Sequence, residues 1–232
     1  MINLYNKSVM RTKLEHRTLP DYNLLEELIN SISHGLGALF GVIVLVMLIL
    51  KSIQNNNVAQ LITGIIYALS LIALYTCSTV YHAITHKFTK KVMQIIDHCM
   101  VYILIGGSYT PILVCSIMKV SPVKSIILLI IIWIIIIISI ILNSIDLEKY
   151  KIFAHISYLA LGWIVITILK DTYIALTHDG FMILLYGGIA YTIGAIIYGI
   201  GVKKRYFHSI FHFFVLAGSI IQFISIYLYV FI

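Results

Sequence analysis

Charged residues are scarce in this chain of 232 residues, and their scarcity excludes an ordinary water-soluble domain. Asp, Glu, Lys and Arg together make up only 11% of the sequence, whereas 61% is hydrophobic. A soluble domain usually keeps roughly a quarter of its residues charged. A lipid bilayer is therefore the expected solvent, and the length of the chain sets a number of membrane spans rather than of domains.

Cysteine pairs and signal-peptide features are also lacking. The three cysteines, Cys77, Cys99 and Cys115, are odd in number and match no zinc or redox spacing. We therefore expect them to be packing residues with free thiols. Residues 1–30 are polar and have no apolar core before a cleavage site, so we expect no cleavable signal peptide. We expect residues 1–30 to be a cytoplasmic tail that ends in an amphipathic entry helix, and residues 31–232 to be the membrane domain.

Seven apolar segments are long enough to cross the hydrocarbon core, which takes about 20 residues of α-helix. None alternates polar and apolar residues as a membrane β-strand does. The predicted fold class is therefore all-α, a polytopic membrane protein with a bundle of seven transmembrane helices. Gly106, Gly107 and Pro111 predict a kink in the third span, and the fourth span, centred on Trp133, is expected to face lipid. The seven segments are Ile32–Leu50, Val58–Tyr81, Cys99–Met118, Ser125–Leu142, Ile152–Leu169, Phe181–Val202 and Ser209–Ile232.

Lysine and arginine are unequally divided between the two sides of this topology. The N-terminal tail and the second, fourth and sixth loops carry twelve of them, and the other side carries four. Cytoplasmic loops are the ones enriched in these residues. We therefore expect a multi-pass protein of the cell membrane with its N-terminus in the cytoplasm and its C-terminus outside. The net charge of +7 then reflects loops beside anionic lipid, and no nucleic-acid partner is expected.

The nine histidines stand out among the polar residues of the chain by their position in the topology. In the predicted topology all of them except His178 lie toward the cytoplasmic side. Ionisable residues inside a membrane are costly, so they are functional candidates by default. The histidines are His16, His34, His82, His86, His98, His155, His178, His208 and His212.

Three polar groups have helical spacing, which places the members of each group on one helix face. One enters the first span, one lies near the cytoplasmic end of the second span, and one opens the seventh. Asp97, with His98 beside it, is expected to follow a short loop at the start of the third span. The groups are Glu27, Asn30 and His34; Ser78 and His82; and His208 and His212.

This pattern predicts a metal site. Two histidines one turn apart can bind one ion, and a third from another helix completes the set, so His82, His208 and His212 are the predicted ligands. Zinc with three histidines and an open fourth position is typical of catalytic sites, where the bound water becomes acidic. Asp97 is expected to accept a proton from that water or to orient it. Ser78 is expected to hydrogen-bond the water or a substrate carbonyl.

Each feature also has a simpler explanation when it is taken alone. An interfacial histidine is usually an amphipathic residue at the headgroup level, and Asp97 could pair with His98 or with a loop lysine. Glu27 and Asn30 could belong to a solvated entry helix. The prediction therefore depends on the conjunction of several polar helix faces, from spans that are not neighbours in the sequence, at one membrane depth.

The same residues carry a resemblance to a known family. Glu27-x2-Asn30-x3-His34, Ser78-x3-His82 with Asp97 following, and His208-x3-His212 together resemble the haemolysin III family, the bacterial branch of the progestin and adipoQ receptors, which include the adiponectin receptors. The resemblance implies a seven-helix bundle with its N-terminus inside. It also implies a zinc ion held by His82, His208 and His212, with Asp97 and Ser78 near its water and with Glu27, Asn30, His34 and His98 around the cytoplasmic mouth. The wider superfamily includes alkaline ceramidases, which implies hydrolysis of a lipid amide. In one departure, Gln222 stands in the last span where some members have a histidine.

Three functions remain open at this point. The first is a membrane-embedded zinc hydrolase that acts on the amide or ester of a membrane lipid. The second is a receptor-like or regulatory protein in which zinc is structural. The third is a pore-forming haemolysin, as the family name suggests, although seven long apolar spans commit the chain to the membrane that makes it, and the fourth span lacks the polar stripe of a channel.

Overall fold

The computed structural model describes residues 14, 17–201 and 204–232, and within them every regular element is helical. The all-α prediction is therefore confirmed for this part of the chain. His16 and Val202, which belong to two of the predictions above, lie outside the described residues. The elements are α2 (Leu24–Gln54), α3 (Val58–Ala83), α4 (Lys87–Pro111), η3 (Ile112–Ile117), α5 (Met118–Val120), α6 (Pro122–Ile145), α7 (Lys151–Gly162), η4 (Ile164–Ile168), α8 (Leu169–Ile200), α9 (Phe207–Ser225) and η5 (Ile226–Val230).

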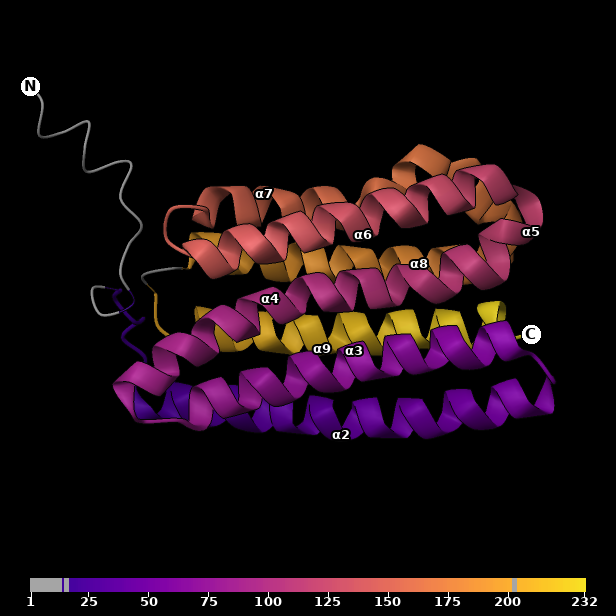
Figure 1. Cartoon of the computed structure of the whole chain (residues 1–232). Coiled ribbons are helices and arrows are strands. Elements are labelled where there is room, and N and C mark those ends of the chain that lie inside the picture. The colour runs from indigo at the N-terminus through magenta and orange to yellow at the C-terminus, as the bar shows by residue number, and fades with distance from the viewer. Residues whose placement is uncertain (1–13, 15–16, 202–203) are drawn as a thin grey trace, which may run out of the picture.

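The long helices lie side by side in one bundle (Figure 1). In sequence order α2 packs on α3, α3 on α4 and α4 on α6, while α8 packs on α9. Helix α9 also contacts α2, so the last helix returns to the first. This closure brings the beginnings of α2 and α9 to the same end of the bundle as the end of α3 and the beginning of α4 (Figure 1).

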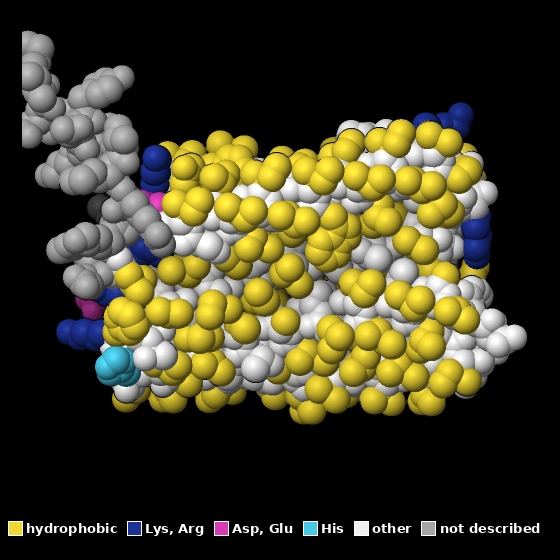
Figure 2. All heavy atoms as spheres, in the orientation of Figure 1, with side chains coloured by type: hydrophobic (Ala, Val, Ile, Leu, Met, Phe, Trp, Pro, Cys, Tyr) yellow, Lys and Arg dark blue, Asp and Glu magenta, His cyan; other side chains and the backbone are white. Residues whose placement is uncertain are grey.

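The face of the bundle shown in Figure 2 is apolar between its two ends, as expected for a chain solvated by lipid. Among the described residues, six helical stretches are long and apolar enough to cross a membrane. Helix α6 is the most apolar of them, and the isoleucines along its outer side are about half exposed, among them Ile127, Ile134 and Ile141. Charged side chains gather at the two ends of the face in Figure 2. The protein is therefore a multi-pass membrane protein.

The first helix begins and ends at defined polar residues. Asn23 and Glu26 form a capping box, in which each side chain accepts a hydrogen bond from the other residue's backbone N–H. Helix α2 then runs without a break to Gln54, so the predicted boundary at residue 30 lies inside it. A three-residue turn follows, in which Asn56 takes a left-handed conformation at φ 48° and Asn57 caps α3.

The third apolar segment departs from α-geometry at the predicted place. Pro111 ends α4, and the next six residues, Ile112–Ile117, form a π-helical segment. Proline lacks the N–H that would continue the ladder of hydrogen bonds, and π-segments are a common way of absorbing such an irregularity. Gly107 lies so close to Ser70 of α3 that a Cβ atom at this position would overlap its side chain.

The structure differs from the sequence prediction in where α4 starts. We expected Asp97 at the start of the third span, but α4 begins at Lys87, capped by the His86 side chain, and Asp97 lies almost three turns inside it. The apolar stretch marks only the part of the helix that faces lipid or core, whereas the helix itself continues through Lys90 and Lys91. Both lysines belong to the second loop of the topology predicted from the sequence.

The fifth and sixth apolar segments are also arranged differently from the prediction. The α-helical part of the fifth ends at Gly162, and a 3₁₀ segment, Ile164–Ile168, leads directly into α8. The expected loop before Phe181 is largely helical, and the chain direction changes at Thr177, which has φ 60° and ψ 177°. This conformation is strained for a residue with a Cβ atom.

Candidate metal centre

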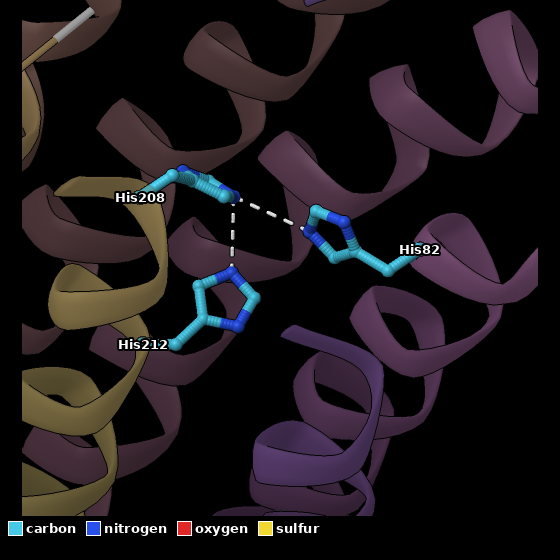
Figure 3. A group of neighbouring side chains, drawn as sticks. All are labelled: His82, His208 and His212. Carbon is cyan, nitrogen blue, oxygen red and sulfur yellow. Dashed lines mark hydrogen bonds between the residues drawn. The ribbon is translucent and has the colours of Figure 1, made fainter. Parts of the chain in front are cut away.

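Three histidines converge at one end of the bundle (Figure 3). His82 lies in the last turn of α3, and His208 and His212 lie on one face of the first turns of α9. The Nε2 atom of His208 is 3.2 Å from Nε2 of His82 and 3.0 Å from Nε2 of His212. One nitrogen from each ring lies within 4.8 Å of the others, an arrangement that could hold a metal ion. The structure therefore brings together the three residues that the sequence predicted as ligands.

The arrangement of donors and lone pairs on these rings fits a cation between them. Nδ1 of His82 is 2.6 Å from Oε2 of Glu27, and an ionised carboxylate only accepts, so Nδ1 donates and Nε2 of a neutral His82 carries a lone pair. Nε2 of His208 faces Nε2 of both His82 and His212, and a single proton on it could bridge well to only one of them. One cation would accept the lone pairs of all three rings. The donor set of this site thus fits a metal that prefers nitrogen ligands.

Helix α2 and the residues just before it contact each of the three rings. The carboxylate of Glu27 holds His82, and the amide of buried Asn30 lies 3.5 Å from the same Nδ1 atom. The ring of Tyr22 stacks on His208 with 4.9 Å between ring centroids and 16° between planes. The ring of His34 stacks on His212 at 3.6 Å and 14°. Glu27, Asn30 and His34 therefore share one helix face, as their spacing predicted.

The carboxylate of Glu27 is satisfied at both oxygens. Nζ of Lys90 lies 2.9 Å from Oε1, while Oε2 faces His82. The same ammonium group donates to the backbone carbonyls of His82 and Ile84, which end α3. Lys90 thus contacts both the carboxylate that binds His82 and the backbone of His82 itself. Sequence analysis missed this residue because it looked like a loop lysine that only reports topology.

Asp97 and Ser78 lie together on the cavity side of the histidines. Both line the same cavity as His208 and His212, and the Asp97 carboxyl interacts with Ser78 and with His82. Asp97 is only partly buried because part of its surface faces this cavity. A carboxylate in this position can accept or return a proton inside the cavity, and the Ser78 hydroxyl can orient its partner.

A cavity of about 250 Å³ extends from the histidines into the bundle. Its polar end carries the site residues, and its remaining walls are mostly apolar side chains of α4, α7, α8 and α9. His98 and Ile112 both line it and are fourteen residues apart on one helical segment, which corresponds to about 21 Å at 1.5 Å per residue. The cavity therefore runs along the bundle axis for a large part of the hydrocarbon thickness, which is about 30 Å.

The other predicted histidines have separate surroundings. His98 lines the cavity, and its backbone carbonyl accepts a hydrogen bond from Tyr158, but its ring is outside the group of three. His155 also lines the cavity and stacks on Tyr198. His178 contacts Tyr173 beside the turn at Thr177. Gln222 lines the cavity more than two turns beyond His212, and it too is outside the group of three.

Tyr22 is the site residue that sequence analysis overlooked most completely. It precedes α2, so it has no helical spacing to the other polar residues, and aromatic residues are common where a chain enters a membrane. Its ring is nevertheless partly buried over His208, and burial raises the pKa of its hydroxyl, which keeps the group neutral. Tyr198, whose ring centroid lies 5.5 Å from that of His208, was also missed, because it is one tyrosine among many in the chain.

A bundle of long apolar helices that encloses a group of three histidines, two of them buried and one partly buried, defines a polytopic membrane protein with a candidate metal centre. Comparison with known proteins places the chain more narrowly. The family model described as "Haemolysin-III related" matches residues 22–223, a range that includes all of the site residues discussed above. The chain belongs to this family, and the resemblance inferred from its three motifs is confirmed.

Similar proteins occur in bacteria and in mammals. The chain is 35% identical to "Hemolysin-3 homolog" of Bacillus subtilis (strain 168), over 90% of this chain and 96% of the relative. It is 35% identical to "Hemolysin-3" of Bacillus cereus, over 88% and 92%. It is 28% identical to "Monocyte to macrophage differentiation factor" of Homo sapiens, over 76% and 74%. No solved structure matches the chain.

Proposed function

We propose that this protein is a zinc-dependent hydrolase within the membrane that cleaves an amide or ester bond of a membrane lipid. The observation that carries the proposal is the position of the three histidines. They converge at the polar end of a long apolar cavity, and that end also holds Asp97 and Ser78. A lipid fits this arrangement, because its acyl chain is apolar and the bond to be cleaved lies near its polar end.

Zinc is the metal that best fits the donors. Three neutral imidazoles from His82, His208 and His212 match the ligand set of catalytic zinc sites, which keep one position open. When bound, zinc would polarise the carbonyl of the substrate and make a water molecule acidic enough to ionise near neutral pH. A Ca²⁺ or Mg²⁺ ion would instead favour oxygen ligands, which this group of three lacks.

The residues of the chain would supply the proton transfers. A carboxylate oxygen of Asp97 takes a proton as the oxygen of water bonds to the carbonyl carbon. The protonated Asp97 then returns this proton to the leaving nitrogen or oxygen as the carbon–heteroatom bond breaks, which yields a fatty acid and an amine or alcohol. Ser78 interacts with Asp97 and would keep its carboxyl turned toward the cavity.

The apolar walls of the cavity would hold the acyl chain. Gly188 of α8 offers a direct test, because it lines the cavity and has open space around it, with no atom within 4 Å of an added Cβ. In Gly188→Phe the new ring should fill the cavity and lower kcat/KM for a long-chain substrate by at least about tenfold, since displacing two buried methylenes at about 0.8 kcal/mol each already exceeds the roughly 1.4 kcal/mol of a tenfold change. Zinc content should not change. Activity against lipid amides of graded chain length measures the effect.

Gly199 provides the matched control. It lies on the same helix with open space around it, but it does not line the cavity. Gly199→Phe should therefore leave kcat/KM unchanged. If Gly188→Phe cleaved long-chain substrates as well as Gly199→Phe does, the cavity would not be the acyl-chain site.

We also propose that the chain crosses the membrane seven times. The stretch Lys151–Ile200 counts as one apolar stretch of 50 residues, which as a straight helix would be about 75 Å long. The hydrocarbon core is only about 30 Å thick. The backbone of Thr177 supports two crossings that meet at a reversal, and α7 and α8 lie side by side (Figure 1). The excess of lysine and arginine favours the histidine end as the cytoplasmic side of the cell membrane.

Reporter fusions test this topology. A reporter that is active only outside the cytoplasm should be active when it is fused after Ile232 and inactive when it is fused within the loop after Ile145. The opposite pattern would invert the proposed orientation. Equal activity at both positions would contradict an odd number of crossings between them.

The names of two relatives suggest haemolysis, but the cavity favours hydrolysis. A water-filled pore requires polar side chains along its length. Beyond its polar end, the described part of this cavity has mostly apolar walls, with Leu104, Ile112 and Phe181 among them. A structural role for the metal is the stronger alternative, since three histidines from α3 and α9 would also hold these helices together. The turnover measurements described below separate this role from catalysis.

A further inference from the structure

We infer that the segment Tyr22–His34, which supplies none of the three histidines, positions all three of them for the metal. The inference depends on the proposed metal site and extends it to α2 and the residues just before that helix. Each histidine has its own partner in this segment: one partner accepts a hydrogen bond and two stack on a histidine ring.

His82 is positioned by a hydrogen bond. Because Nδ1 donates to the Glu27 carboxylate, Nε2 is left unprotonated and the ring cannot rotate without losing a buried, charge-assisted bond of 2.6 Å. The His82 side chain is fully buried, and that of Glu27 is 17% exposed. Lys90 fixes the other oxygen of the carboxylate. Such outer contacts of a ligating histidine set its tautomer and increase its basicity.

His208 is positioned by stacking and by the start of its helix. Tyr22 covers one face of the ring. The adjacent carboxylate, Glu26, accepts a 2.6 Å hydrogen bond from the backbone N–H of Tyr206, which precedes α9 in a left-handed conformation at φ 64°. This conformation is unfavourable for tyrosine, so the bond to Glu26 stabilises the turn from which α9 begins. Glu26 lies 180 residues before Tyr206 in the sequence, and this hydrogen bond fixes the chain two residues before His208.

His212 is positioned by the ring of His34. The rings of His34 and His212 lie almost parallel, with 3.6 Å between their centroids. The ring of Tyr75 meets the His34 ring edge-on at 5.0 Å. Both ring nitrogens of His34 are buried and have no hydrogen-bond partner among the described protein atoms. His34 is also outside the group of three. Its contact with His212 is therefore made by the ring face rather than by a nitrogen, and an aromatic ring of similar shape should replace it.

One helical face is able to reach both ligand-bearing helices. Glu27, Asn30 and His34 lie at i, i+3 and i+7, and α2 packs against α3 as well as α9. Holding ligands in place before the metal arrives reduces the entropy lost on binding, and it is the usual function of the residues around a metal site. The first polar motif of the sequence thus gains a function that its spacing alone did not reveal.

Zinc affinity of the purified full-length protein tests the inference, measured by competition with a chelator of known affinity. Glu27→Ala should bind Zn²⁺ about 10–100-fold more weakly than the wild type. Glu27→Gln should lose less, since its amide oxygen still accepts from Nδ1 of His82. Tyr22→Ala and His34→Ala should each weaken binding, whereas Tyr22→Phe and His34→Phe keep a ring in place and should restore it. Glu148→Ala, at an exposed carboxylate, is the control and should bind as the wild type does.

Cobalt provides a readout that a loss of general stability would not change. The visible absorption of bound Co²⁺ reports the ligand geometry, so Glu27→Ala should shift the spectrum at saturating metal and Tyr22→Phe should not. If all three alanine variants bound Zn²⁺ within about threefold of wild type, with unchanged Co²⁺ spectra, the inference would be overturned. Failure of the wild type itself to bind Zn²⁺ would instead overturn the proposed function. If an alanine variant does not fold, the comparison of Glu27→Gln and His34→Phe with wild type decides.

Discussion

Asp97→Asn should abolish most turnover of a long-chain lipid amide while the protein keeps its zinc. The amide has nearly the same shape as the carboxyl group and still reaches Ser78, but it cannot take up the proton of the attacking water. Loss of a positioned general base typically lowers the rate about 10²–10⁴-fold. The measurement is kcat for purified protein in detergent, together with the metal content of the same sample.

The two numbers together separate the functions that remain open. Full zinc with turnover lowered at least about 100-fold supports Asp97 as the catalytic base. Turnover of Asp97→Asn within about threefold of wild type would remove Asp97 from the mechanism. If the wild type turned over no lipid amide or ester, and chelation only lowered its Tm, the structural-metal function would be favoured.

His212→Ala should lower zinc affinity by at least about 100-fold, because it removes one of three protein ligands, and a single lost outer-shell contact already costs 10–100-fold. Turnover should fall in parallel. His212 is 1% exposed and touches the rings of His34 and His208. Chelator competition measures the affinity.

His155→Ala is the matched control for this experiment. His155 lines the same cavity but lies outside the group of three, and its ring stacks on Tyr198 instead. It should keep zinc affinity within about threefold of wild type. Equal losses of affinity in His155→Ala and His212→Ala would mean that the three histidines are not the binding set.

Helical periodicity carried much of the site prediction. His208 and His212 are one turn apart, Ser78 and His82 likewise, and these intervals place each pair on one face whatever the rest of the bundle does. The choice of His82 as the third ligand followed from its place at the same membrane depth on another span and from the resemblance to the haemolysin III family. The structure brings His82, His208 and His212 within 4.8 Å of one another, as this reasoning requires.

Hydrophobicity gave less information where a helix extends beyond its apolar part. Lys90 appeared to be a loop residue, yet it lies in the first turn of α4 and holds Glu27. Asp97 appeared to start a span and lies well inside a helix. A hydropathy pattern detects contact with lipid, and a polar helical turn at the membrane surface has none.

Contacts without a sequence period could not be predicted. Tyr22 meets His208 across most of the chain length, and only the return of α9 to α2 brings them together. The change of chain direction at Thr177 lies within the loop expected between Leu169 and Phe181, but hydropathy did not indicate that the residues on both sides of Thr177 are helical. The contact of Tyr22 with His208 depends on packing of the whole bundle rather than on local preference.

The most direct test of the proposed metal centre is the metal content of the wild-type protein, purified without chelators and measured by elemental analysis beside the variant His82→Ala/His208→Ala/His212→Ala. We expect about one zinc per chain in the wild type, as in sites with a single set of three histidines, and almost none in the variant. Equal metal contents in the two proteins, or a wild type that stays free of metal even after zinc is added, would contradict the proposed metal centre.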